Sequence, residues 1–157
     1  MRPILAASAL SLLFAMFPFA TAVEAGTTPA CPYTAAELSA VVGVPVEAGT
    51  GQETSDSGGP RLYCYYAAGS VSIQLYQYVR HAPLSPTERR RLFSGQAIAN
   101  DPDSATWLEN AEGSTFIALG YFRHSTKIEL VIDGFDLQQE AVTKPVKERL
   151  LKLRRVP

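Results

Sequence analysis

The pairing of two cysteines, Cys31 and Cys64, would constrain the fold of this 157-residue chain more than any other feature. Residues 1–25 are typical of an export signal, because Arg2 precedes a long apolar run and then small residues that suit cleavage. We expect residues 26–157 to form one mature domain. Because an exported chain enters an oxidising compartment, the two cysteines are expected to form a disulfide.

The sequence around the second cysteine predicts a β-hairpin. In RLYCYYAAGSVSIQLYQYV, apolar residues alternate with period two on both sides of AAGS. A turn centred on Ala68-Gly69 pairs residues whose numbers add to 137: Tyr66 with Val71, Cys64 with Ile73, and Leu62 with Leu75. All six share one face, which we expect to be the core face, so Cys64 points inward.

The first cysteine stands just before a predicted helix. Thr34 and Glu37 match a capping box, and Gly43 is a typical helix terminator. A bond between Cys31 and Cys64 would therefore fasten the start of this helix to the inner face of the hairpin. Thiol catalysis and metal binding are weaker interpretations, because no CxxC or Cys/His spacing is present.

Two segments flank the first hairpin. Residues 47–60, EAGTGQETSDSGGP, contain no large apolar side chain and predict a mobile polar loop. Ser85 and Glu88 match a second capping box, which predicts a helix that runs to about Ala99.

The C-terminal half predicts three more elements. A short strand is expected at 106–108, and a second hairpin pairs residues of 116–132 whose numbers add to 249. The last helix is expected to open at Asp136. The predicted fold is α+β: an antiparallel sheet of two hairpins, with helices packed on one face and one disulfide.

Few residues suggest chemistry. No nucleophile elbow, zinc-protease motif, P-loop or dinucleotide-binding motif is present, so we expect no catalytic residues, metal or cofactor. His81 and His124 fall at a strand exit and in a turn, and the acidic residues around Pro102 suit turn capping. The net charge of −1 argues against nucleic acid as a partner. A weak contact with an anionic surface is predicted for the basic C-terminal residues Lys144, Lys147, Lys152, Arg154 and Arg155.

The outer face of the first hairpin is the predicted binding surface. Tyrosine brings large, stiff, amphipathic contact area and is enriched at recognition surfaces. Tyrosine also favours strands for purely structural reasons, which is the alternative interpretation. The residues assigned to this face are Tyr63, Tyr65, Ser72, Gln74, Tyr76 and Tyr78.

The pattern CPYTAAELSAVVGVPV, followed by a Gly-rich segment, CYY and VSIQLYQYV, resembles small bacterial envelope lipoproteins and sensor-like domains of unknown function. In those proteins a cysteine precedes a TAAE-type helix, and a second cysteine lies on a strand. The resemblance covers mainly residues 31–79 and implies no catalytic residues. Such lipoproteins carry a lipidated cysteine near the N-terminus, whereas we expect Cys31 not to be lipidated, because Thr28 stands where a lipidation site has leucine.

Together these observations predict a periplasmic or secreted, non-catalytic binding module that recognises a protein or an envelope component through the outer sheet face. Two alternatives remain open. One is an inhibitor or immunity protein that blocks a periplasmic enzyme by inserting a loop such as residues 49–59. The other is a small hydrolase with an unrecognised site.

Overall fold

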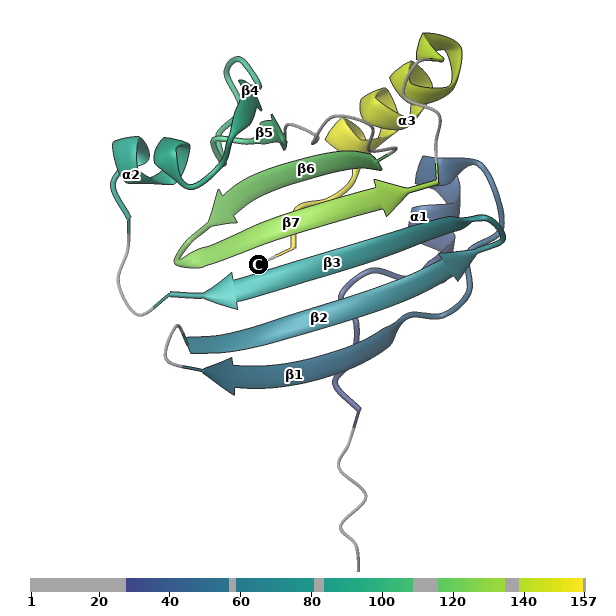
Figure 1. Ribbon diagram of the computed structural model, residues 1–157, viewed down its shortest axis with the longest axis horizontal. Helices are drawn as coiled ribbons and strands as arrows, with labels where there is room; N and C mark the ends of the chain where they lie inside the picture. Colours follow the sequence, from purple (N-terminus) through teal and green to yellow (C-terminus); the bar gives the residue numbers. More distant parts are fainter. Residues whose placement is uncertain (1–27, 57–58, 81–83, 109–115, 135–138, 157) are drawn as a thin grey trace, which may run out of the picture.

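The structure is a computed structural model that describes residues 28–56, 59–80, 84–108, 116–134 and 139–156. Within these residues the chain forms one antiparallel sheet of seven strands in the spatial order β1-β2-β3-β7-β6-β5-β4 (Figure 1). The strands are β1 (Thr50–Asp56), β2 (Gly59–Ala68), β3 (Val71–Val79), β4 (Gly95–Ala97), β5 (Thr106–Leu108), β6 (Phe116–Arg123) and β7 (Thr126–Asp133). The helices are α1 (Ala35–Val42), α2 (Pro86–Arg91) and α3 (Glu140–Lys152). None of these described helices has the length and apolar character needed to cross a membrane.

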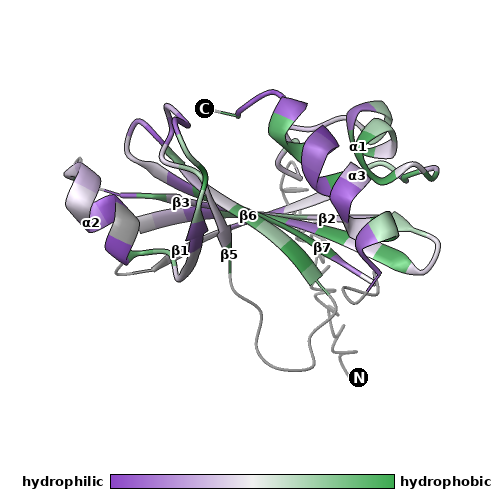
Figure 2. Ribbon diagram, turned by 90° about the horizontal axis from the view of Figure 1, so that it is seen from above, coloured by the Kyte–Doolittle hydropathy of each residue, from purple (hydrophilic) through white to green (hydrophobic). Residues whose placement is uncertain are grey.

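One face of the sheet, here called the inner face, carries the core. Figure 2 shows α1 and α3 together on one side of the twisted sheet. Apolar side chains alternate along the central strands and meet the apolar sides of these two helices. The largest fully buried apolar side chains include Leu38, Tyr66, Ile73, Leu75, Leu119, Leu130 and Leu150. The order of elements and this packing confirm an α+β fold.

Both capping boxes form as predicted. The Thr34 hydroxyl accepts the Glu37 N–H at 3.2 Å, and the Glu37 carboxylate accepts the Thr34 N–H at 2.8 Å. Ser85 and Glu88 make the same reciprocal pair at the start of α2. These bonds satisfy backbone N–H groups that a helix start otherwise leaves without partners.

The two predicted hairpins differ in how well their registers match. The β6–β7 register agrees with the prediction, since Ile117 lies opposite Ile132. In the β2–β3 hairpin the predicted register is wrong by two residues, because Cys64 lies opposite Leu75 and the turn is Gly69-Ser70. Gly69 adopts a φ of 63°, which suits the first position of a tight hairpin turn. A shift of two keeps every side chain on its predicted face.

The prediction of a polar loop over residues 47–60 is wrong. Residues 50–56 form β1, which pairs antiparallel with β2 at the edge of the described sheet. Because backbone pairing needs no apolar side chain, a polar segment suits an edge strand. The loop through which an inhibitor would insert is therefore largely a strand.

The prediction of a helix from Ser85 to Ala99 is also wrong beyond its first turns. α2 ends at Arg91, and Gly95, with a φ of 145°, lies outside the helical region. Phe93 then packs against Gly120 and Phe122 on the face opposite α1 and α3. Packing on the inner face therefore applies to α1 and α3, whereas the segment around α2 lies against the outer face.

The residues after α3 fasten the C-terminal end to the inner face. The Tyr33 hydroxyl donates to the Arg154 carbonyl at 3.1 Å, and the Val156 N–H donates to the Tyr121 hydroxyl at 3.2 Å. Val156 is fully buried. The expected start of the last helix at Asp136 lies outside the described residues; α3 begins at Glu140.

Candidate functional site

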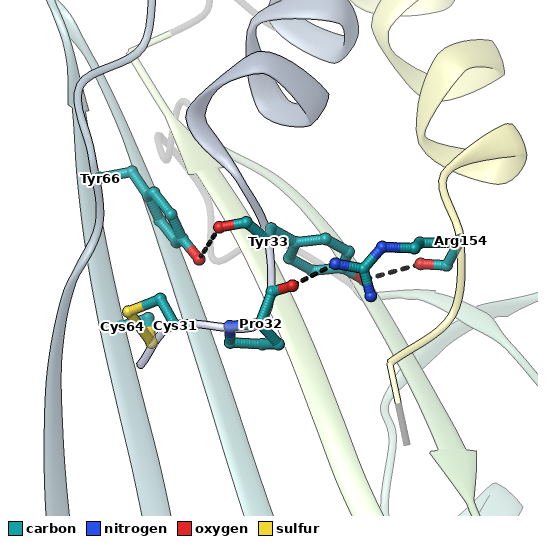
Figure 3. Close-up of a disulfide and its surroundings, with 6 residues drawn as sticks. All are labelled: Cys31, Pro32, Tyr33, Cys64, Tyr66 and Arg154. Carbon is teal, nitrogen blue, oxygen red and sulfur yellow. Dashed lines mark hydrogen bonds between the residues drawn. A yellow bond between two sulfur atoms is a disulfide. The ribbon is translucent and has the colours of Figure 1, made fainter. Parts of the chain in front are cut away.

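The predicted disulfide joins α1 to the inner face of the sheet. Cys31 and Cys64 are bonded, with their Cα atoms 5.8 Å apart, and Cys64 is fully buried (Figure 3). Beside the bond, the Tyr66 hydroxyl donates to the Tyr33 carbonyl at 3.1 Å. The bond therefore holds the chain entering α1 against β2, as the sequence predicts.

Arg154 ties the C-terminal segment to the same place. Its guanidinium donates to the Pro32 carbonyl, drawn in Figure 3, and to the Glu37 carboxylate. The hydrogen bond from Arg154, followed by that from the Thr34 backbone, lowers the pKa of the Glu37 carboxyl to about 2. Glu37 therefore caps α1 and anchors the C-terminal segment at once.

The predicted binding residues lie on the opposite, outer face of β2 and β3. We call this set the tyrosine face: Tyr63, Tyr65, Ser72, Gln74, Tyr76 and Tyr78. Three of its rings form a connected row. The Tyr63 and Tyr76 ring centroids are 5.1 Å apart across the two strands, and those of Tyr76 and Tyr78 are 6.3 Å apart with nearly parallel planes. Each ring of the row is therefore supported by its neighbour.

Two cations hold one end of this row. The Arg61 guanidinium carbon lies 5.2 Å from the Tyr78 ring centroid, and the Lys127 ammonium lies 5.5 Å from it. Lys127 also lies 5.0 Å from the Phe93 ring centroid and pairs with Glu129 at 2.6 Å. The charges of Lys127 and Glu129 thus offset each other at the border of the tyrosine face.

The other members of the tyrosine face are less tightly grouped. Tyr65 lies opposite Gln74 and is 40% exposed. The Tyr76 hydroxyl donates to the Gln74 side-chain oxygen at 2.6 Å. Ser72 lies next to the hairpin turn, opposite Ala67, and away from the row of rings.

The phenols of Tyr76 and Tyr78 have raised pKa values. Burial, followed by the field of Tyr63, raises the pKa of Tyr76. Burial, followed by the charge of Glu129, raises the pKa of Tyr78. Both therefore keep their O–H groups, of which that of Tyr76 is donated to Gln74.

The sequence did not indicate three residues at the border of the tyrosine face: Lys127, Glu129 and Phe93. Lys127 and Glu129 reach the site because β7 pairs with β3, and Phe93 because the chain folds back after α2. The alternation over residues 127–131 does place both charged residues on one side of the predicted second hairpin. Nothing in that pattern indicates which strand would neighbour it.

The basic C-terminal residues do not form one charged patch. Arg154 bonds Glu37, and Lys147 lies 5.4 Å from the Trp107 ring centroid. Arg155 pairs with Asp101 at 2.9 Å, with both side chains nearly buried. Contact with an anionic surface stays a prediction for the exposed Lys144 and Lys152.

The other polar residues considered above have local roles. The Asp101 carboxylate accepts the N–H groups of Asp103 and Ala105, as expected for turn capping. His124 is exposed in the β6–β7 turn, and His81 lies outside the described residues. No cluster of three or more His, Cys, Asp or Glu side chains suited to a metal occurs in the described part of the chain.

Two hollows of the described surface lie outside the row of tyrosine rings, and Arg61 borders one of them. One, of about 440 Å³, lies beside Glu53, Leu62 and Val79 on the inner face. The other, of about 460 Å³, lies between α1 and α3, next to Val41 and Lys152. The tyrosine face is instead an open surface on β2 and β3, the two longest strands of the described sheet.

Comparison with known proteins adds no family to this description. No protein-family model matches the chain, and no curated protein or solved structure matches it.

Proposed function

We propose that the protein is an exported, non-catalytic binding module of the cell envelope, which recognises a protein or an envelope component through the tyrosine face. The observation that carries this proposal is the connected row of Tyr63, Tyr76 and Tyr78, fixed at one end by Arg61 and Lys127. Rings held in place lose little conformational freedom on binding, so more of the contact energy remains as affinity.

The disulfide supports the export part of the proposal. Disulfides persist mainly in oxidising compartments such as the periplasm and the cell exterior. The Cys31–Cys64 bond therefore suits a periplasmic or secreted protein, as does the export signal proposed for residues 1–25. That segment lies outside the described residues.

The burial pattern also supports a binding role for the tyrosines. Tyr65 is 40% exposed, and Tyr63, Tyr76 and Tyr78 are partly exposed, whereas Tyr66 on the same strand is fully buried. The inhibitor and hydrolase alternatives stay predictions.

The test is capture of material from an envelope extract of the source organism by the oxidised mature protein. Tyr65→Ala and Tyr76→Ala should fold with the disulfide intact but retain little of what the wild type retains. Leu151→Ala is the matched control, because Leu151 is 41% exposed on α3, away from this face. Equal capture by all four proteins would contradict the proposal.

A further inference from the structure

Resting on the proposed function, we propose that the ligand of the tyrosine face is a neutral carbohydrate chain. The relevant surface is the outer face of three neighbouring strands, over residues 50–54 of β1, 61–67 of β2 and 72–78 of β3. Residues directly opposite each other in an antiparallel pair share a face, so the registers assign the side chains of this surface.

The composition of this surface is aromatic and polar but almost uncharged. The registers place on it four tyrosines, two glutamines, three hydroxyl residues, one alanine and one arginine. The arginine is Arg61, whose guanidinium lies over the Tyr78 ring. No aliphatic side chain larger than alanine occurs at the outward positions of these three segments.

This composition matches the chemistry of a sugar chain. The C–H faces of a pyranose ring pack against aromatic rings, and its hydroxyls both donate and accept hydrogen bonds. Tyr63, Tyr76 and Tyr78 supply the rings, while Gln52 and Gln74 supply amides that can donate and accept. The phenol oxygens of Tyr76 and Tyr78 lie beside the rings, and that of Tyr76 can accept a hydrogen bond while its O–H is donated to Gln74.

The charge of the surface argues against a polyanion. Binding of a polyanion depends on several cations that replace its counterions. Here the border cation Lys127 is paired with Glu129, and Arg61 is the one cation among the outward positions of the three segments. A neutral ligand fits this balance of charge, and its binding would depend little on salt.

The shape of the surface is an open strip on three neighbouring strands. Its size suits an extended chain, because the seven residues of 61–67 span about 20 Å and three strands span about 10 Å. A short run of linked sugar rings would lie along it.

The test uses wall polysaccharide of the source organism, freed of protein by hot detergent and proteinase K and broken into soluble oligosaccharides by partial acid hydrolysis. The neutral fragments that pass through an anion exchanger are the probe. The oxidised mature protein should bind these fragments, and its affinity should change less than twofold between low and high salt. Tyr76→Ala should weaken binding by about tenfold or more, while Leu151→Ala should not. Immobilised heparin is the polyanion probe and should not retain the protein.

The outcomes separate the two proposals. Failure to bind the fragments, together with tyrosine-dependent capture of envelope protein, would overturn the carbohydrate inference and leave the binding face in place. Salt-sensitive binding to heparin that requires Arg61 would also overturn it. If the tyrosine variants capture as much envelope material as the wild type, both the binding face and the carbohydrate inference would be overturned. If single sugars, produced by complete hydrolysis, bind as tightly as the oligosaccharides, the ligand would not be an extended chain lying along the three strands.

Discussion

Removing the disulfide should cost a large share of the stability of this domain. The bond joins residues 33 apart in sequence, and closing a loop of that length stabilises a fold by about 4 kcal/mol in the chain-entropy model. Domains of this kind are stable by about 5–15 kcal/mol in total. The double variant Cys31→Ser/Cys64→Ala should therefore remain folded but much closer to its unfolding midpoint.

The assay is urea unfolding followed by circular dichroism. With a slope of about 2 kcal/mol per molar urea, a loss of 4 kcal/mol lowers the midpoint by about 2 M. The wild type should shift by a similar amount when a strong reductant is added, whereas the double variant should not respond to reductant. An unchanged midpoint in the double variant, or two titratable thiols in untreated protein, would refute the reasoning.

Three further substitutions test the packing around the two faces. Gly120→Ala places a methyl group against the Phe93 ring and should destabilise the fold by about 1–3 kcal/mol, measured by thermal unfolding. Arg155→Ala removes the cationic partner of Asp101, whose carboxylate keeps the N–H groups of Asp103 and Ala105, and should cost about 1.5–3 kcal/mol in urea unfolding. Glu37→Gln tests pH dependence: the lowered pKa of Glu37 stabilises the fold above about pH 4.5, and this contribution is lost as the pH falls toward 2. The wild type should therefore lose more stability than the variant across that interval.

Each of these substitutions has its own control. Adding Phe93→Ala to Gly120→Ala should make the glycine substitution nearly neutral, and a fully additive cost would show that the ring is not the cause. Lys144→Ala removes an exposed cation from α3 and should leave stability almost unchanged. Parallel loss of stability in the wild type and Glu37→Gln would contradict the link between Glu37 and the acid response.

The parts of the fold that follow from local chemistry could be predicted from the sequence. A capping box requires only residues three apart, so the starts of α1 and α2 at Thr34 and Ser85 were correct. Period-two alternation assigned each side chain of β2 and β3 to its face. That assignment survives the register error at the Gly69 turn, because a shift of two leaves the faces unchanged.

The remaining features depend on contacts between distant segments. β1 forms an edge strand through backbone pairing with β2, which does not require apolar side chains. Its polar sequence therefore shows no alternation from which a strand could be predicted. Besides β2, β3 pairs with β7, whose sequence contains nothing specific to that pairing. The place of Lys127 beside Tyr78 could therefore not be predicted. The pair of Arg155 with Asp101 likewise forms only once the C-terminal segment crosses the inner face.

The most direct test of the binding face follows the tyrosine rings themselves. The chain has seven tyrosines: four on the tyrosine face, and Tyr33, Tyr66 and Tyr121 buried in the core. NMR spectra of protein labelled only in its tyrosine rings should be recorded with and without soluble wall oligosaccharides. Signals from the four outer rings should shift on binding, while those of the three core rings stay unchanged. Bound ligand that leaves the outer rings unaltered, or that perturbs the core rings alone, would contradict the account.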